Sequence, residues 1–423
     1  MSKNYKAKIF SNFFALSVVQ GANFLIPLVI MPYVISRIGI DSFGIISVAQ
    51  VTMIYLSTIA DYGFNLTATR EVALYRNEQN TEKISRIFFT VLSTKIIITA
   101  FLFLVLLVLV GIIPFFKTNF LLYIAGFAYV IGQSLLVSWF FQGIEKMKFV
   151  TYSVLLARIV FAVSVFLFIK GPRDSFLFLF FFGLGSILAG FYSIYKAVKV
   201  FKLSLLYPRW SDILSQLKDG WQIMISNLSA NVYLFANVFI LRIFAGDLIV
   251  GYYSIAEKIF LAIRQMLSVF SQAIYPHICQ LTEKSKNQTV VFFKIFYLPF
   301  LLLVMVGCSV VFIFSSPITQ LFAGKESDLS GFLLRILSIV PIIVCLNIPA
   351  NLLLLSLNQK KSYFRVSILG TVINLLANIV LAKVWGATGT VIAIIITEVF
   401  ITIGLNIELY RNNLTDYIKL RAT

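Results

Sequence analysis

Polar and ionisable side chains interrupt the long apolar runs of this sequence at spacings typical of helices. The richest set lies in the run 248–278, and its members are Ser254, Glu257, Arg264, Ser268 and Ser271. Successive members are three, four or seven residues apart, which places all five on one helical face. A polar face in an apolar helix is expected to line water or the interior of a helix bundle. The chemistry that it offers is binding through charge and hydrogen bonds.

Other apolar runs carry similar groups, as a stripe near the start of the chain, as pairs one turn apart, or as single cations. The candidate cavity residues are Arg264, Lys258, Lys95, Arg158, Asn227, Asn231, Gln20 and Asn23. We interpret these groups as the lining of a hydrated cavity of net positive charge, formed mainly by the first, second, seventh and eighth predicted helices, with Lys95 and Arg158 in the third and fifth. The sequence leaves a second interpretation open, in which these groups satisfy one another as contacts between helices.

Four acidic residues also lie in or at the ends of these runs. Glu257 is adjacent to Lys258, so the two charges can offset each other. Glu398 lies in mid-run, where a contact between helices and the coupling of an ion are both open interpretations. Asp61 and Glu408 lie near the ends of their runs, and we expect both to face solvent.

Several kinds of catalytic chemistry are missing from the sequence. The chain has one His, and its three Cys residues stand apart in apolar stretches, so a Cys/His metal centre is excluded. No GxxxxGK[ST] motif occurs, which argues against nucleotide hydrolysis. The loops predicted on the outer side are all short, so they cannot form a catalytic domain. We therefore expect a transporter without a cofactor rather than an enzyme.

The elements that position these groups are predicted to be membrane-spanning helices. The chain is 60% hydrophobic and 12% charged, against ~25% charged in a soluble domain. We predict an all-α polytopic protein with about twelve spans, most of them longer than the ~20 residues needed to cross a bilayer. Their ranges are 9–34, 41–64, 86–113, 119–141, 151–169, 174–197, 219–242, 248–278, 291–315, 329–356, 364–383 and 386–409.

The basic residues set the predicted orientation. The net charge is +18. Segments between successive spans lie alternately on the two sides of the membrane, and most Lys and Arg residues outside the spans fall on the side that holds both termini. Because cytoplasmic loops are enriched in Lys and Arg, we expect an inner-membrane protein with both termini in the cytoplasm. In a soluble protein the same positive charge would suggest binding of nucleic acid. Here the orientation in the membrane explains the charge.

An internal repeat organises the predicted spans. Gly44 begins the pattern GxxSxA[QE], and Gly251 begins it again 207 residues later, each at the start of the second span of its half. We predict two six-helix lobes related by a parallel repeat, which can rock about a central cavity. The predicted boundaries are 1–198 for the first lobe, 199–218 for a basic, amphipathic cytoplasmic linker, 219–410 for the second lobe and 411–423 for a cytoplasmic tail.

Several motifs along nearly the whole chain resemble one family. They are VVQGANFLIPLVIMPYVISRIGIDSFGIISVAQ (18–50), DYGFNLTATREVA (61–73), FQGIEKMKFVT (141–151), VGYYSIAEKIF (250–260) and QAIYPHI (272–278). In this order they resemble the Wzx-type flippases, which are the O-antigen and polysaccharide repeat-unit transporters of the MOP superfamily. The resemblance implies a MOP flippase-like fold. It also implies transport of an undecaprenyl-pyrophosphate-linked oligosaccharide from the cytoplasmic to the periplasmic leaflet by alternating access.

The resemblance also implies roles for particular residues. A cationic cavity suits an anionic pyrophosphate, and Arg264, Lys258 and Lys95 are the candidates to contact it or an acidic sugar. Arg37 and Arg70 are implied gating residues at opposite faces, with anchoring at the membrane surface as the alternative. Transport is expected to use an H⁺ or Na⁺ gradient or the membrane potential. The candidate ion-coupling residues are Glu257 and Glu398.

The implied partners are the lipid-linked oligosaccharide and the bilayer, with an O-antigen polymerase and a chain-length regulator as further candidates. A multidrug exporter or an exporter of another lipid-linked glycan, of the same superfamily, is the first alternative function. The excess of cations within the spans argues against cationic drugs as cargo. An O-antigen polymerase is the enzymatic alternative, which a large periplasmic loop would favour. A structural membrane protein is the third, and it would not need charges in mid-span.

Overall fold

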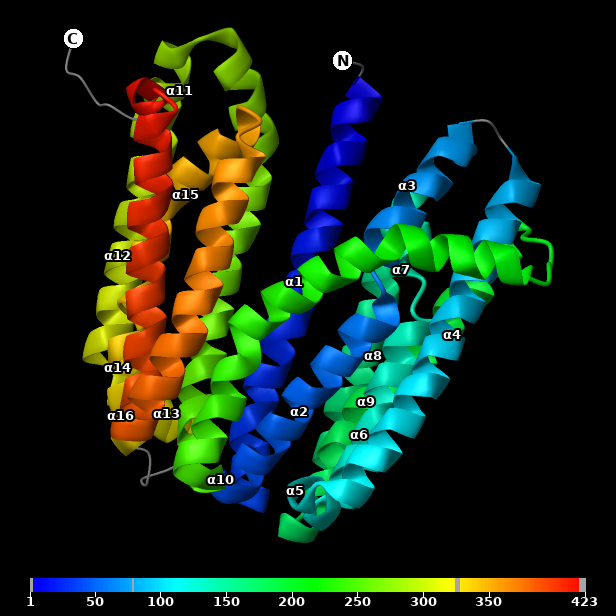
Figure 1. Ribbon diagram of the computed structural model, residues 1–423, viewed down its shortest axis with the longest axis horizontal. Helices are drawn as coiled ribbons and strands as arrows, with labels where there is room; N and C mark the ends of the chain where they lie inside the picture. Colours follow the sequence, from blue (N-terminus) through cyan, green and yellow to red (C-terminus); the bar gives the residue numbers. More distant parts are fainter. Residues whose placement is uncertain (1–2, 78–79, 324–327, 418–423) are drawn as a thin grey trace. The chain divides into compact units, whose positions relative to one another are not determined.

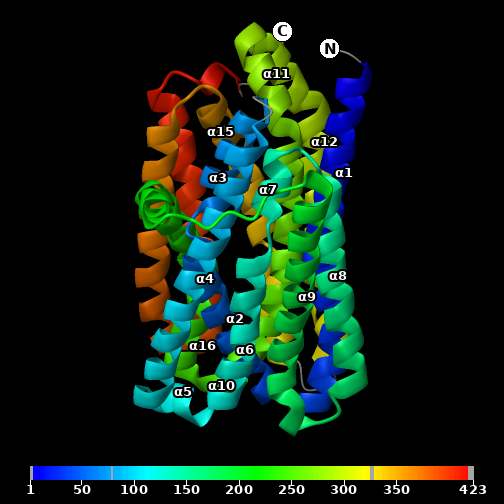
Figure 2. The ribbon, with the colours of Figure 1, turned by 90° about the vertical axis from the view of Figure 1, so that its right-hand side faces the viewer.

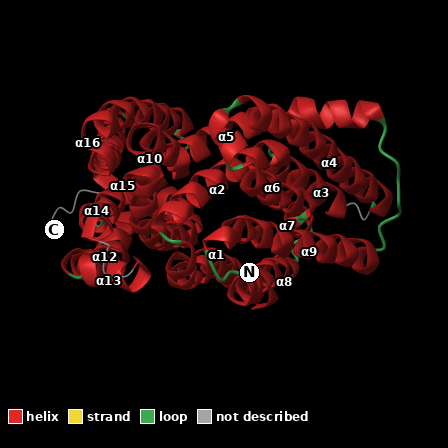
Figure 3. Cartoon of the chain, turned by 90° about the horizontal axis from the view of Figure 1, so that it is seen from below, coloured by secondary structure: helices red, strands yellow, loops and turns green. Residues whose placement is uncertain are grey.

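The computed structural model describes residues 3–77, 80–323 and 328–417, so the last six residues of the predicted tail lie outside the described part. All regular elements of this part are helical, which confirms the predicted all-α class (Figure 3).

The α-helices up to residue 201 are α1 (Lys3–Ile38), α2 (Ile40–Asp61), α3 (Phe64–Asn77), α4 (Thr81–Ile112), α5 (Pro114–Thr118), α6 (Phe120–Leu135), α7 (Ser138–Gly143), α8 (Met147–Phe168) and α9 (Ser175–Phe201). They are followed by α10 (Trp210–Lys284), α11 (Lys286–Phe292), α12 (Leu298–Ile313), α13 (Ser315–Ala323), α14 (Asp328–Leu337), α15 (Val340–Ser356) and α16 (Lys360–Arg411). Three short helices complete the list: η1 (Pro172–Asp174), η2 (Phe293–Tyr297) and η3 (Thr415–Tyr417).

Ten stretches of the described residues are long and apolar enough to cross a membrane. Two of them, Trp210–Tyr275 and Lys361–Arg411, far exceed the ~20 residues of one crossing. Each contains a glycine with non-helical backbone angles, Gly246 in α10 and Gly386 in α16. The protein is therefore polytopic, as predicted, whereas the count of twelve spans stays a prediction.

The predicted repeat has a counterpart in the backbone. Gly39 separates α1 from α2 with φ 83° and ψ 163°, and Gly246 interrupts α10 with φ 78° and ψ 176°. These two glycines are also 207 residues apart, which is the offset of the GxxSxA[QE] pattern. Glycine adopts this positive φ without the steric cost that a Cβ brings. Equivalent points of the two halves thus turn with the same backbone geometry.

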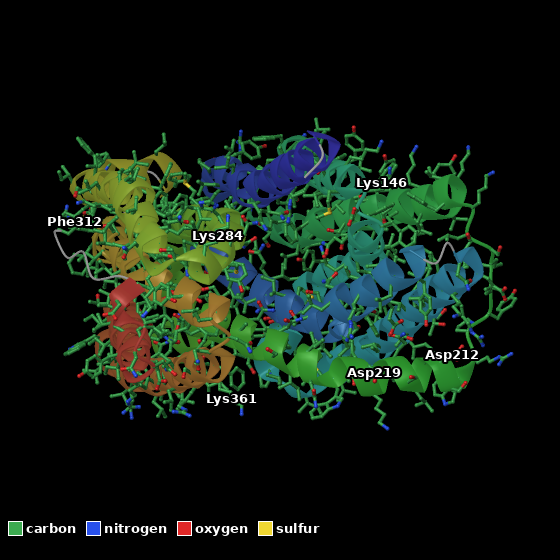
Figure 4. The ribbon with its side chains drawn as sticks, turned by 90° about the horizontal axis from the view of Figure 1, so that it is seen from above. Lys146, Asp212, Asp219, Lys284, Phe312 and Lys361 are labelled. Carbon is green, nitrogen blue, oxygen red and sulfur yellow. The ribbon has the colours of Figure 1, made fainter. Side chains whose placement is uncertain are left out.

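The chain forms two compact units, Met1–Phe235 and Ala236–Thr423. The division falls within α10, so the first part of this helix belongs to the N-terminal unit. Polar contacts hold it there: Arg86 Nε lies 2.9 Å from Asp212 Oδ2, and Gln216 Nε2 donates to Glu71 Oε2 at 2.9 Å. Figure 4 labels Asp212 and Asp219 along this part of the chain. The predicted linker is thus already helical from Trp210, while its role between the lobes stays a prediction.

Three helices of the N-terminal unit approach one another closely at glycines of α9. Figures 1 and 2 show α6, α8 and α9 side by side. A Cβ on Gly183 of α9 would lie 2.4 Å from the backbone nitrogen of Tyr129 in α6. A Cβ on Gly185 would lie 2.2 Å from the backbone oxygen of Ala157 in α8. Small residues allow such close approach of helices in membranes, and here they fix α8 against α9.

This contact yields a stability prediction. Gly185→Ala places a methyl group against the Ala157 backbone, so we expect a destabilisation of ~2 kcal/mol, as for other overpacked sites. The matched control is Gly111→Ala on α4, where a Cβ meets nothing within 4 Å. Thermal unfolding of the purified proteins measures the difference. Equal melting temperatures for the two variants would contradict the packing described here.

Candidate functional site

A polar pocket of about 280 Å³ lies within the N-terminal unit. Its walls come from α1, α6, α7, α8 and α9. The polar lining comprises the amides of Gln20, Asn23, Gln133 and Gln142, the hydroxyls of Tyr129, Ser138, Ser153 and Ser186, and the guanidinium of Arg158. Burying so many polar groups between apolar helices is costly unless they serve binding or one another. The pocket is therefore the candidate site of this unit.

Arg158 is held in one orientation by two helices. Its Nε and Nη2 donate to Asn23 Oδ1 at 3.0 and 2.9 Å, which links α8 to α1. Its guanidinium carbon lies 4.7 Å from the centre of the Phe182 ring on α9. The Phe182 ring in turn stacks on Tyr129 with ring centres 4.7 Å apart. The structure thus brings together three predicted cavity residues, Gln20, Asn23 and Arg158.

The break between α6 and α7 shapes one wall of this pocket. In a continuous helix the Val137 N–H would bond to the carbonyl oxygen of Gln133, but it donates instead to Ser193 Oγ at 3.4 Å. The freed carbonyl accepts a hydrogen bond from Lys95 Nζ at 3.2 Å. Irregular backbone at membrane depth is tolerated where it is buried in protein or lines a cavity. The predicted span 119–141 is therefore interrupted, and the interruption has its own polar support.

Lys95 lies behind the pocket wall, with 2% of its side chain exposed. Its Nζ is 3.1 Å from Asp61 Oδ1, and Asp61 Oδ2 accepts a hydrogen bond from Asn65. The expectation that Asp61 simply faces solvent is wrong, because this ion pair leaves 19% of its side chain exposed. The contacts give Lys95 a supporting position, and its predicted contact with the cargo stays a prediction.

The C-terminal unit contains a second buried ion pair. Arg264 Nη2 on α10 lies 2.8 Å from Glu398 Oε1 on α16, and the two side chains are 23% and 2% exposed. This pair joins the predicted cargo contact to a predicted ion-coupling acid. Glu408, also expected to face solvent, is instead 8% exposed and lies 3.4 Å from Arg411. At these positions charges satisfy one another across and along helices.

Glu257 and Lys258 lie on the same helix as Arg264. Glu257 is buried, and its Oε1 accepts a hydrogen bond from the Tyr253 hydroxyl at 3.0 Å. Lys258 is half-buried. The cluster therefore combines an acid, a phenol and a cation within two turns of α10.

The remaining candidate residues lie at three other places of the N-terminal unit. Asn231 Nδ2 donates to Thr58 Oγ1 at 2.7 Å, and Asn227 is half-buried one turn earlier on α10. Arg37 is exposed in the last turn of α1 and lies over the Tyr33 ring. Arg70 is exposed on α3, which lies at the opposite end of this unit from the end of α1 (Figure 1). Opposite faces were predicted for the two arginines, and their gating roles stay predictions.

Two of the four amides in the pocket were not predicted from the sequence. Gln133 and Gln142 line it together with Gln20 and Asn23. Gln142 lies in the FQGIEKMKFVT segment that carries the family resemblance, and Gln133 is a lone amide in the apolar run 119–141. An intramembrane polar residue is a site candidate by default, so the same criterion could have found both.

Comparison with protein families identifies the class of the chain. Residues 9–282 match the family described as polysaccharide biosynthesis protein, which is more than half of the sequence. The chain belongs to this family.

Individual relatives agree with this assignment. The chain is 30% identical to a "Putative O-antigen transporter" of Shigella dysenteriae over 93% of its own length and 98% of the relative. It is 27% identical to a protein of the same description from Escherichia coli strain K12, over 96% and 98% of the two chains. The solved structure of the lipid II flippase MurJ in an inward closed conformation covers 98% of this chain and 89% of its own, with a TM-score of 0.67 and 14% identity. At this identity the likeness to MurJ concerns the fold.

Proposed function

We propose that the chain is a flippase for undecaprenyl-pyrophosphate-linked oligosaccharides, the repeat units of O-antigen, and that it moves them from the cytoplasmic to the periplasmic leaflet of the bacterial inner membrane. The chain is a transporter and not an enzyme, in agreement with its two relatives that are described as O-antigen transporters. Membership of a polysaccharide biosynthesis family supports a polysaccharide precursor as the cargo. The lipid carrier, the direction and both cytoplasmic termini belong to the proposal.

The observation that carries the proposal is the polar pocket around Arg158. It combines hydrogen-bonding amides and hydroxyls with one cation inside a bundle of apolar helices. Broken helices commonly form the substrate sites of membrane transporters, and the break between α6 and α7 lines this pocket. A glycan with many hydroxyls needs such partners when it leaves water.

The transport cycle that we propose is alternating access between the two repeated lobes, driven by an H⁺ or Na⁺ gradient or the membrane potential. The buried acids Glu257 and Glu398 are the proposed coupling residues. Glu257 accepts a hydrogen bond from Tyr253, and Glu398 pairs with Arg264. Protonation or ion binding at either carboxylate would weaken these contacts. An O-antigen polymerase and a chain-length regulator would act on the delivered units.

Deletion of the gene tests the proposal. We expect lipid-linked repeat units to accumulate in the cytoplasmic leaflet and surface glycan to be lost, with both restored by the wild-type gene. Staining of surface glycan and extraction of lipid-linked sugars measure these changes. Normal surface glycan together with altered drug sensitivity would contradict the proposal and favour a multidrug exporter.

A further inference from the structure

The pocket of the N-terminal unit has a volume of about 280 Å³, which is enough space for one sugar residue. The lining also includes the apolar side chains of Leu136, Phe141, Val154 and Ala157. A pyranose ring combines apolar C–H faces with a belt of hydroxyls, so both kinds of surface find a counterpart.

The charge of the pocket limits what its ligand can carry. Arg158 is the one cation among its lining residues, and no acid is among them. A pyrophosphate bears at least two negative charges, and a single guanidinium cannot compensate them away from water. The amides and hydroxyls around it donate and accept hydrogen bonds without adding charge. The ligand that fits is therefore neutral or singly anionic.

The orientation of Arg158 narrows the ligand further. A guanidinium has five N–H donors in one plane, and Asn23 takes one from Nε and one from Nη2. The Phe182 ring covers one face of the group. Three donors remain, and two of them form a fork on the edge between Nη1 and Nη2, which matches a planar oxygen group. The carboxylate of a hexuronate offers two oxygens to this fork, and the carbonyl of an acetamido group offers one oxygen with two lone pairs.

We propose that this pocket binds one monosaccharide residue that carries a planar oxygen substituent, either a carboxylate or an acetamido group, and that Arg158 recognises this substituent. Gln20, Gln133 and Gln142 bind the ring hydroxyls. The pyrophosphate of the cargo lies outside the pocket. This inference rests on the proposed function for the source of the sugar, because a flippase of lipid-linked glycans would bring such a residue to the site.

Protection of a cysteine in the pocket tests the proposal without requiring transport. Ser138→Cys is introduced into the purified full chain after Cys279, Cys308 and Cys345 have been replaced by alanine, and its labelling by a maleimide is timed. At a sugar concentration of about four times Kd, labelling should slow about fivefold, since the free fraction falls as 1/(1 + [L]/Kd). We expect this with glucuronate or N-acetylglucosamine, and the stronger of the two names the substituent.

Four controls make the result decisive. Glucose and inorganic pyrophosphate should not protect the cysteine at the same concentration. Arg158→Leu should remove the protection, and Ser36→Cys, at an exposed position, should be labelled at one rate throughout. Equal protection by glucose, or protection by pyrophosphate alone, would overturn the proposal. Because labelling reports binding and gene deletion reports transport, the subsite and the flippase function can fail separately.

Discussion

Replacing Lys95 by methionine will destabilise the protein by ~3 kcal/mol, because it removes one partner of a buried ion pair. The side chain of Asp61 is 19% exposed in the wild type, and in the variant its carboxylate would have no cation beside it. The Gln133 carbonyl at the helix break would also lose a hydrogen-bond donor. Removing one member of a buried pair costs ~3–5 kcal/mol, and the partial exposure of Asp61 favours the lower end. Thermal unfolding of the purified protein measures the loss.

A second variant separates the charge from the shape. In Lys95→Met with Asp61→Asn no uncompensated carboxylate remains, so we expect this double variant to recover most of the lost stability. Lys117→Met, at an exposed lysine of α5, is the matched control and should unfold like the wild type. A double variant at least as unstable as the sum of its single changes would contradict the pairing of Lys95 with Asp61.

Replacing Arg264 by alanine will reduce surface glycan ~10-fold or more while the protein level stays normal. A change of this size corresponds to a free energy typical of the coupling between two sites. The structure adds a reason to expect that Arg264 contacts the cargo, as the sequence predicted. Arg264 is 23% exposed, so it can contact cargo, and it is paired at 2.8 Å with Glu398, which is 2% exposed. Quantified glycan per cell, divided by the amount of protein in the membrane, measures the effect.

If the ion pair of Arg264 with Glu398 acts as a unit, the effects of the two substitutions on surface glycan will not be additive. Glu398→Gln should lower surface glycan as well, and the double variant should transport no worse than the poorer single variant. Arg365→Ala provides a control, since this arginine is 64% exposed and lies 3.8 Å from Glu408. Wild-type glycan in the Arg264 variant would remove this residue from the transport site.

The sequence was sufficient to predict the helical, polytopic class and part of the candidate site. Buried polar residues stand out against apolar runs, so Gln20, Asn23 and Arg158 were found, although their mutual contact was not. The repeat read from the GxxSxA[QE] pattern has the same offset as the turns at Gly39 and Gly246, which the structure revealed. These features depend on local composition and period, which a single sequence displays directly.

What the sequence did not reveal depends on contacts between distant helices. Asp61 lies 34 residues from Lys95, and Glu398 lies 134 residues from Arg264, so their pairing requires the packed bundle. The break at Leu136–Val137 contains neither glycine nor proline. Its support comes from Lys95 and from Ser193 on other helices, and no local signal marks it. The expectation that Asp61 faces solvent failed for this reason, whereas Glu408 is paired with Arg411 along its own helix.

Transport in vesicles tests the central claim most directly. The purified protein is reconstituted with an undecaprenyl-pyrophosphate-linked oligosaccharide in one leaflet, an ion gradient is imposed, and a membrane-impermeant reagent reports when the glycan reaches the other leaflet. We predict that the glycan crosses faster with the wild-type protein than in protein-free vesicles, and that Arg158→Leu abolishes the gain. Crossing at the protein-free rate with the folded wild-type protein present would contradict the account.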